Sequence, residues 1–357
     1  MKILFLTNGL GLGNSTRCHA IIQHLKDHEA NVEVVTSGNG VWYFSDKNEI
    51  DKIHEIEALA YGSKDGAISI TRTFTSILGM IKTLKRNADK LSEVLDTVNP
   101  NVIVTDSDYN FLPIKKRKIP IVALNNADVV WHSFFKFKNR PDSIKPQFFG
   151  IEMLDHLFHK IVPDLVVSPT LDPLVPIKGK NILRVGPIVR KGYERSFRKG
   201  AACRAVVMLS GSAFGTPVDF KKDHYPIKID VIGRSLPKEQ TVRKDVVFHG
   251  KVKNTYQYLK NADIAVVNGG FSAVSEMCWM GIPLIVVPVP RHAEQWINAR
   301  TVQHLGLGDI ATQENYEQIL MQSIVNIPNF RKAYNKITKF DNGANQAARA
   351  IIDIANT

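Results

Sequence analysis

The sequence predicts an α/β protein with two Rossmann-like domains, each a doubly wound parallel sheet between layers of helices. Short apolar runs, typical of buried strands, alternate with amphipathic stretches, and the pattern begins again after the middle of the chain. Strands that alternate with helices form parallel sheets covered on both faces. The length of 357 residues agrees with two domains, since one domain takes about 150 residues.

The first domain is expected to span residues 1–185. A helix is predicted over Arg17–Leu25, and a longer helix over 74–98, where apolar residues recur at helical spacing. The buried strands of this domain are predicted at Ile3–Thr7, Val32–Thr36, Val102–Thr105, Ile121–Leu124 and Leu165–Ser168.

The second domain is expected over residues 186–340, after a junction near Asn181–Arg190, around Val185–Pro187, where a strand meets glycine, proline and a basic run. The tail, 341–357, is predicted to form a helix over Gly343–Ala355 that packs back on the first domain. Ligands of open parallel sheets bind at the carboxyl ends of the strands, so we expect the site in a cleft between two facing sheets. The strands of this domain are predicted at Val206–Leu209, Ile229–Ile232, Val246–Phe248, Ile264–Asn268 and Leu284–Pro288.

Composition narrows the class of protein. Hydrophobic residues make up 44% and charged residues 22% of the chain, which excludes a disordered protein, a collagen and a disulfide scaffold. The three cysteines lie far apart in no metal-binding pattern, which favours a reducing compartment. No apolar run approaches the roughly 18 residues of a membrane span. The apolar run at the N-terminus is too short for a signal peptide. We therefore expect a cytoplasmic protein, able to sit peripherally on the inner face of the membrane.

The charge favours anionic partners. The net charge is +12, with +3 on the first 185 residues and +9 on the remainder. A basic surface attracts phosphorylated ligands, nucleic acids or acidic lipid headgroups. Nothing in the sequence assigns an oligomeric state.

In each of the two predicted domains, a glycine-rich loop follows the first predicted strand. In Asn8–Thr16, the glycines Gly9, Gly11 and Gly13 permit tight turns and bring a helix N-terminus close to an anion or a substrate oxygen. The spacing departs from the dinucleotide fingerprint and no acidic residue ends the next strand, which argues against NAD or FAD. The loop Ser210–Gly215 repeats this arrangement in the second domain, and a plain turn explains it equally well.

The third loop, Asn268–Glu276, is the most specific. Gly269 and Gly270 give backbone access, and Ser272 is expected to cap a helix whose N-terminus can hold a phosphate. Glu276 lies about one turn inside this helix, where its carboxylate can accept hydrogen bonds from a ribose diol. Balancing the dipole at the start of the helix is the simpler role for Glu276, but the residues around it favour the ribose contact.

Polar residues also cluster just beyond the strand Leu284–Pro288. Their amide, carboxylate and imidazole groups suit recognition of the hydroxyls of a sugar. These residues are His292, Glu294, Gln295 and Asn298.

The segments Asn268–Glu276, Gly281–Pro283 and Glu294–Ala299 together resemble the donor-binding segment of GT-B glycosyltransferases. The likeness is greatest to the peptidoglycan N-acetylglucosaminyltransferase, of glycosyltransferase family 28, and to related bacterial and archaeal transferases. Gly9–Arg17 and Val185–Pro187 look similar too, so the resemblance follows most of the chain in order.

This resemblance implies a nucleotide-sugar donor, usually a UDP-sugar, and no bound metal or other cofactor. It implies that Glu276 holds the ribose hydroxyls and that backbone near Val252 contacts the uracil. It further implies that Gln295, with Glu294 and Asn298 nearby, contacts the donor sugar. The diphosphate would face Asn268, Gly269, Gly270 and Ser272 on one side and Ser212 on the other.

The catalytic base is the main departure from the resemblance. Relatives often carry a histidine at the position of Asn14, and an asparagine takes no proton at neutral pH. The resemblance places Gly11, Gly13 and Asn14 on the acceptor side. We expect Asp106, or else Asp108, after another strand of the same domain, to accept the proton; Asp106 is the first choice. A turn-capping role explains Asp106 equally well, and His19 is expected to be structural. Otherwise the acceptor needs no base, or the protein binds its ligand without catalysis.

The acceptor is less well marked. Aromatic and basic residues mix over 129–140, followed by Phe148–Phe149, and the stretch 72–145 has a net charge of +6. Such a mixture suits an interfacial patch on an anionic membrane that carries a lipid-linked acceptor or an envelope glycan precursor; a helix with a solvated basic face explains it equally well. Nucleic acid, as the acceptor of a DNA-modifying glycosyltransferase, is a weaker candidate, supported by the basic run Arg190–Lys199. A nucleotide-sugar epimerase and a non-catalytic binding protein also compete with the inverting transferase that the resemblance implies.

Overall fold

The computed structural model describes residues 1–58, 63–64, 67–68, 77–194, 204–209, 218, 220–222, 224–233, 244–336 and 341–357. The chain divides into two compact units, which we treat separately. Unit 1 comprises Met1–Lys191 and Asp341–Thr357, and unit 2 comprises Gly192–Phe340. The chain therefore leaves unit 1 after Lys191, one residue beyond the expected junction segment Asn181–Arg190, and its C-terminal tail belongs to unit 1.

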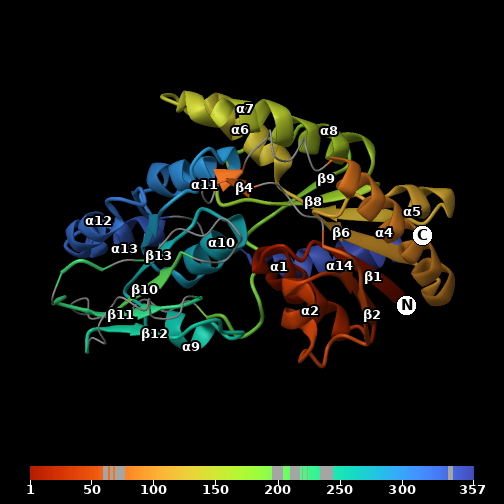
Figure 1. Ribbon diagram of the computed structural model, residues 1–357, viewed down its shortest axis with the longest axis horizontal. Coiled ribbons are helices and arrows are strands. Elements are labelled where there is room, and N and C mark those ends of the chain that lie inside the picture. Colours follow the sequence, from red (N-terminus) through yellow and green to blue (C-terminus); the bar gives the residue numbers. More distant parts are fainter. Residues whose placement is uncertain are drawn as a thin grey trace. The chain divides into compact units, whose positions relative to one another are not determined.

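Unit 1 is built on a sheet of seven parallel strands in the order β3-β2-β1-β6-β7-β8-β9, of which β1, β2, β6, β8 and β9 are labelled in Figure 1. These strands are β1 (Lys2–Thr7), β2 (Asn31–Thr36), β3 (Lys52–Glu55), β6 (Val102–Asp106), β7 (Ile121–Leu124), β8 (Leu165–Pro169) and β9 (Ile182–Val185). The two-residue strands β4 (Ser63–Lys64) and β5 (Ala67–Ile68) pair separately and antiparallel.

Helices cover both faces of this sheet because its strands are apolar on both sides. Ile3 and Phe5 of β1 face a core completed by helices α1, α2 and α14, whereas Leu4 and Leu6 face helix α4. The C-terminal helix α14 packs against α1, next to it in Figure 1. The helices of unit 1 are α1 (Leu12–Lys26), α2 (Asn39–Phe44), α4 (Ile77–Val98), α5 (Leu112–Lys116), α6 (Ala127–Lys136), η1 (Asp142–Ile144), α7 (Lys145–Gln147), η2 (Phe148–Glu152), α8 (Met153–Ile161) and α14 (Gly343–Ala355).

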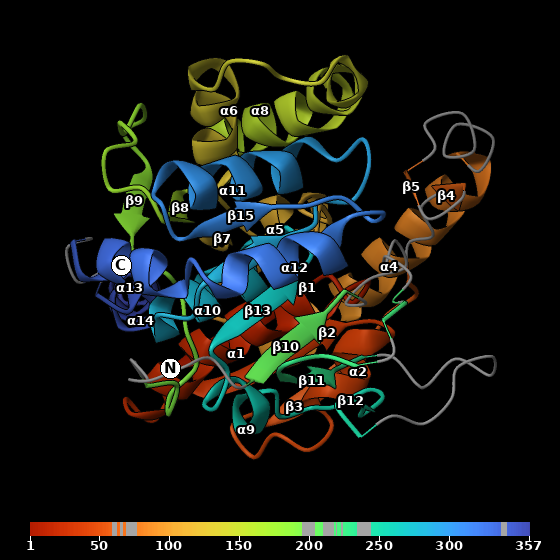
Figure 2. The ribbon, with the colours of Figure 1, turned by 90° about the vertical axis from the view of Figure 1, so that its left-hand side faces the viewer.

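Unit 2 holds six parallel strands in the order β12-β11-β10-β13-β14-β15, with β10, β11 and β13 side by side in Figure 2. The strands are β10 (Arg204–Met208), β11 (Lys228–Val231), β12 (Val246–Phe248), β13 (Ile264–Val267), β14 (Leu284–Val286) and β15 (Gly308–Ile310). The helices are α9 (Tyr256–Leu259), α10 (Phe271–Met280), α11 (Ala293–His304), α12 (Tyr316–Ile324) and α13 (Ile327–Lys336). The two parallel sheets confirm the predicted fold class.

Most predicted elements appear within two residues of their expected ends, with one clear exception. Helix α1 begins at Leu12 rather than Arg17, so half of the first glycine loop is helical. The short strands β3 and β15 were not predicted; both lie at an edge of their sheet, where the apolar signal is weak. Residues 74–76 of the long predicted helix lie outside the described residues.

The strand order brings the candidate loops together within each unit. In unit 1, β1 and β6 are neighbours and Thr7 pairs with Asp106, so the loops after both strands share one edge. In unit 2, β13 lies next to β14, and Val267 pairs with Val286. The glycine loop after β13 therefore lies beside the segment that leads into α11.

Candidate active site

The first glycine loop of unit 1 is fixed against two neighbouring segments. The side chain of Asn8 accepts a hydrogen bond from the Leu10 amide (2.9 Å) and donates one to the Ser107 carbonyl (3.1 Å). A Cβ atom on Gly9 would lie 1.7 Å from the carbonyl oxygen of Ser37, so only glycine fits there. The loop is thus held beside both the turn after β6 and the turn after β2.

Asn14 lies in the first turn of α1 rather than in a loop before it. Gly11 immediately precedes the helix, and the exposed Gly13 is its second residue. Asn14 is partly buried. Its side-chain amide can donate a hydrogen bond to the hydroxyl of the acceptor substrate or accept one from it. No finding tests Gly11, Gly13 and Asn14 as acceptor-side residues, and they stay a prediction.

Asp106, the expected base, is buried in an ion pair. Its carboxylate oxygens accept hydrogen bonds from Arg17 Nε (2.8 Å) and Nη2 (2.6 Å), and the residue has no exposed surface. A buried carboxylate that both prongs of a guanidinium hold has little access to an incoming hydroxyl. This environment favours a structural role for Asp106. The sequence does not reveal its partner, because Arg17 lies 89 residues away along the chain.

Asp108, the second expected base, is partly buried and bonds to Asn110. Its Oδ1 accepts hydrogen bonds from the amide and side chain of Asn110, at 2.9 and 3.0 Å. Burial raises the pKa of the Asp108 carboxyl above its usual value, although these hydrogen bonds oppose that shift. A raised pKa makes a carboxylate a better proton acceptor.

His19 is buried beside Tyr43 and Glu49. Its Nδ1 lies 3.0 Å from the hydroxyl of Tyr43, and its Nε2 lies 3.4 Å from Glu49 Oε1. Burial lowers the pKa of His19 to about 4, against the opposing pull of Glu49.

The third glycine loop, in unit 2, leads from β13 into α10. The residue that precedes the helix is Gly270, so Ser272 lies inside the first turn and does not cap it as we expected. The side chain of Asn268 instead donates to the Val287 carbonyl (3.0 Å), tying the loop to the end of β14. Glu276 is buried, one further turn along α10.

Two residues of α11 hold this loop from behind. Gln295 Oε1 accepts hydrogen bonds from the amides of Gly269 (3.1 Å) and Val289 (3.0 Å). Asn298 Nδ2 donates to the Gly269 carbonyl (2.8 Å). Both side chains, expected on the donor sugar, thus bond to the backbone of the glycine loop.

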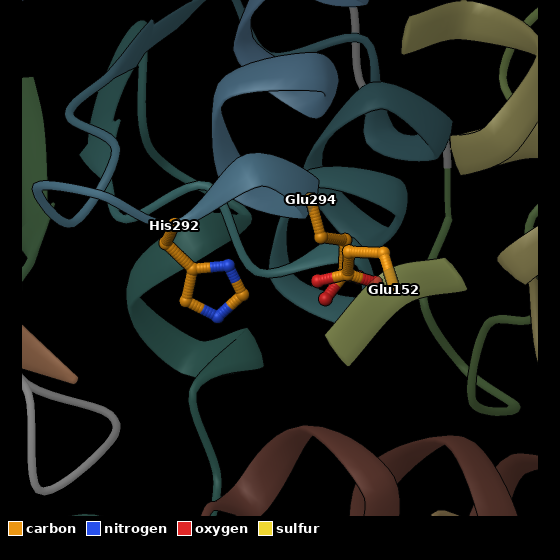
Figure 3. Close-up of side chains that lie close together, drawn as sticks. All are labelled: Glu152, His292 and Glu294. Carbon is orange, nitrogen blue, oxygen red and sulfur yellow. The ribbon is translucent and has the colours of Figure 1, made fainter. Parts of the chain in front are cut away.

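His292 and Glu294 project from the N-terminal end of α11 (Figure 3). The Nδ1 atom of His292 is buried and has no hydrogen-bond partner among the described residues. Burial also lowers the pKa of His292 to about 4, so its ring is neutral near pH 7. An orphaned, neutral imidazole nitrogen suits a hydroxyl group of a ligand.

Two other expectations concern the turns around the nucleotide. Val252 is partly buried in the segment after β12, where Gly250 has a positive φ of 65°. Ser212 and the rest of 210–215 lie outside the described residues. The basic run 190–199 is described only as far as Glu194; within it Arg190 is buried and Lys191 pairs with Asp27.

Comparison with known proteins gives the same class of fold and activity. The model of the glycosyl transferase family 1 matches residues 1–328. An uncharacterized glycosyltransferase of Methanosarcina acetivorans is 25% identical over 95% of this chain and 93% of its own. A shorter match, 33% identical, covers 18% of this chain and 17% of a UDP-N-acetylglucosamine transferase of Deinococcus deserti that acts on N-acetylmuramyl-(pentapeptide) pyrophosphoryl-undecaprenol.

Solved structures share the fold. Arabidopsis thaliana UGT89C1 complexed with UDP has a TM-score of 0.65 at 15% identity, covering 99% of both chains. MurG of Acinetobacter baumannii has a TM-score of 0.59 at 12% identity, again over 99% of both chains. The family match over most of the sequence and the paired parallel sheets lead to one conclusion: the chain belongs to the glycosyl transferase family 1 and is a glycosyltransferase with the GT-B fold.

Proposed function

We propose that this glycosyltransferase transfers a sugar from a UDP-sugar to an acceptor hydroxyl, with the donor on unit 2 and the acceptor on unit 1. The observation that carries the proposal is the anchored glycine loop at the start of α10, with Glu276 buried one turn further along. An α-helix leaves its first amides without internal partners, and these and the helix dipole favour a diphosphate. The UDP bound to UGT89C1, which has the same fold, supports a uridine nucleotide.

The donor contacts follow from the positions of these groups. The amides around Gly270 and Ser272 would face the diphosphate, and the carboxylate of Glu276 would accept hydrogen bonds from the ribose. His292 Nδ1, which has no hydrogen-bond partner in the part of the chain that the structure describes, would bond to a sugar hydroxyl. Val252 would lie near the base.

The reaction needs one proton acceptor and one stabilised leaving group. Asp108 takes the proton of the acceptor hydroxyl, and the oxygen attacks the anomeric carbon as the bond to the diphosphate breaks. UDP leaves, and the amides at the start of α10 stabilise the negative charge on its diphosphate. Attack from the face opposite UDP inverts the anomeric configuration. Because amides neutralise the leaving group, the proposed mechanism is metal-independent, and activity should survive EDTA.

The experiment is a calorimetric titration with UDP, a panel of UDP-sugars, and GDP- and dTDP-sugars. We expect one UDP-sugar to bind tightly, and Glu276→Ala to weaken it by about 10- to 100-fold, because charged hydrogen bonds to the ribose are lost. The exposed Glu314→Ala in the same unit is the matched control. Failure of every nucleotide to bind would overturn the proposal.

A particular surface of unit 1 also supports a lipid-linked acceptor at an anionic membrane. Leu154, Leu157 and Ile161 recur at helical spacing on α8 and are 59%, 43% and 76% exposed. This stripe, with the exposed Phe149 and Ile151 just before it, forms what we call the α8 face. Among the described helices, none has the length and apolarity to cross a bilayer.

The charges around the α8 face complement anionic lipids. Lys160, beside the stripe on α8, and Lys138, just after α6, are exposed and form no ion pair with any described residue. The acids nearest the stripe are turned inward: Asp155 bonds to Tyr109 and Glu152 to Gln147. An apolar stripe flanked by lysines is typical of proteins that bind the interface of an acidic membrane.

Vesicle sedimentation tests this surface. We expect binding to vesicles that contain phosphatidylglycerol and much weaker binding to pure phosphatidylcholine, with a decrease at high salt. Leu154→Ser, Leu157→Ser and Ile161→Ser together should weaken binding about tenfold or more. The equally exposed Leu174→Ser with Ile177→Ser is the control. Unchanged binding by the triple variant would refute the α8 face as the membrane contact.

A further inference from the structure

We infer that Gln295 and Asn298 are positioning residues: they hold the Gly269 peptide so that the amides at the start of α10 point at the diphosphate of the donor. The inference rests on the proposed nucleotide-sugar site and assigns these two side chains a task other than contact with the sugar. Both are buried, and both bond to the same residue of the glycine loop.

The two side chains form hydrogen bonds with both polar backbone groups of Gly269, its amide and its carbonyl. Gln295 accepts from its amide and Asn298 donates to its carbonyl, at 3.1 and 2.8 Å. With both polar groups held, the planar peptides on either side of Gly269 cannot rotate without breaking a buried hydrogen bond. These peptides lead directly into Gly270 and the first turn of α10.

Close packing removes the remaining freedom of the loop. A Cβ atom on Gly269 would lie 2.5 Å from the carbonyl oxygen of Gln295 and 2.8 Å from its Cβ. The backbone of Gly269 therefore packs directly against the first turn of α11. A side chain at position 269 would prevent this close approach. At Gly270, by contrast, an added Cβ would meet no atom of the described residues within 4 Å.

Gln295 also joins this loop to the segment after β14. Its Oε1 accepts from Val289 as well as Gly269, so one oxygen fixes two backbone segments. His292, whose buried Nδ1 has no partner among the described residues, lies between Val289 and Gln295 in the chain. The hydrogen bonds of Gln295 therefore also help to fix the segment that contains His292.

Preorganised amides bind an anion without the cost of ordering a loop at the moment of binding. Loss of the hydrogen bonds to Gly269 should therefore weaken the diphosphate contribution to binding and leave the nucleoside contribution in place. A direct contact with the sugar would give another pattern, because UDP carries no donor sugar. The comparison of uridine, UDP and UDP-sugar affinities separates these roles.

The experiment measures the three affinities by calorimetry for the wild type, Gln295→Met and Asn298→Ala. Methionine keeps the length of glutamine and removes its oxygen. We expect each variant to bind UDP about tenfold more weakly and uridine within about twofold of the wild type. The matched control is Gln303→Met on the same helix, where the glutamine is exposed and bonds to Arg300.

Three results would overturn the inference. Variants that bind UDP normally but lose the preference for UDP-sugar would assign the two side chains to the sugar. Equal weakening of uridine and UDP would show a general loss of structure; thermal unfolding and the less disruptive Asn298→Ser check this. Absence of UDP binding by the wild type would remove the proposed function itself, and this result is distinguishable because it needs no variant.

Discussion

At the scale of the residue, different hydrogen-bond partners separate two aspartates that the sequence offers as candidate bases, with Asp106 as the first choice. Asp106 and Asp108 stand two positions apart after β6, and either could serve as a base. The carboxylate of Asp106 forms an ion pair with the guanidinium of Arg17, whereas burial raises the pKa of Asp108. Removal of one partner from a buried ion pair destabilises a fold, whereas a carboxylate with a raised pKa can take a proton.

The two aspartates therefore give opposite predictions. Asp106→Asn should lower the free energy of unfolding by about 3–5 kcal/mol, because it leaves the Arg17 charge buried without its partner. Asp164→Asn, which breaks the exposed pair with Lys115, should cost about 1 kcal/mol or less. Urea unfolding of the three proteins measures the difference. A stable Asp106→Asn protein without activity would return the role of base to Asp106.

Asp108→Asn should reduce kcat about 100-fold or more and leave the stability and the donor affinity nearly unchanged. In the wild type the rate should fall as the pH falls through the raised pKa of Asp108, since the protonated carboxyl cannot accept a proton. Initial rates from pH 4 to 8 give this limb. Full activity of Asp108→Asn across the range would contradict the assignment.

At the scale of the element, glycines decide how closely a loop approaches its neighbours. Gly9 lies against the backbone of Ser37, and Gly269 lies against the backbone of Gln295. Each contact fixes the start of a helix at the carboxyl end of a parallel strand. The glycine pattern could be predicted from the sequence, but the segments that the glycines touch are distant in the chain.

Gly9→Ala should destabilise unit 1 by roughly 1–3 kcal/mol or more, because the new methyl group overlaps the Ser37 carbonyl. Gly150→Ala is the matched control, since a Cβ at that position meets nothing within 4 Å. Thermal unfolding with and without UDP tests the effect. Equal melting temperatures of the two variants would disprove the close contact.

At the scale of the whole molecule, buried histidines make stability depend on pH in both units. Burial lowers the pKa of His19 in unit 1 and His292 in unit 2 from 6.5 to about 4. Between these values the unfolded chain binds more protons than the folded one, so stability is lost as the pH falls from about 7 to 4. Each histidine accounts for at most about 3 kcal/mol.

Urea unfolding at several pH values between 7.5 and 4.5 measures this slope. His19→Gln should flatten it for unit 1, because the buried titrating group is gone, while the exposed His28→Gln should leave it as in the wild type. The slope, rather than the absolute stability, carries the test, since either substitution can also change packing. An identical slope for His19→Gln would show that this histidine does not govern the acid sensitivity.

The sequence by itself determined the alternation of strands and helices, the two parallel sheets, the C-terminal helix and the glycine loops that point to a glycosyltransferase. These features follow from apolar periodicity and glycine spacing, which are local properties of the chain. Only the tertiary structure decided that Arg17 pairs with Asp106, that Gln295 and Asn298 grip Gly269, and that α8 exposes an apolar stripe. The physical reason is that hydrogen bonds and burial depend on partners far apart in the chain, which no local pattern specifies.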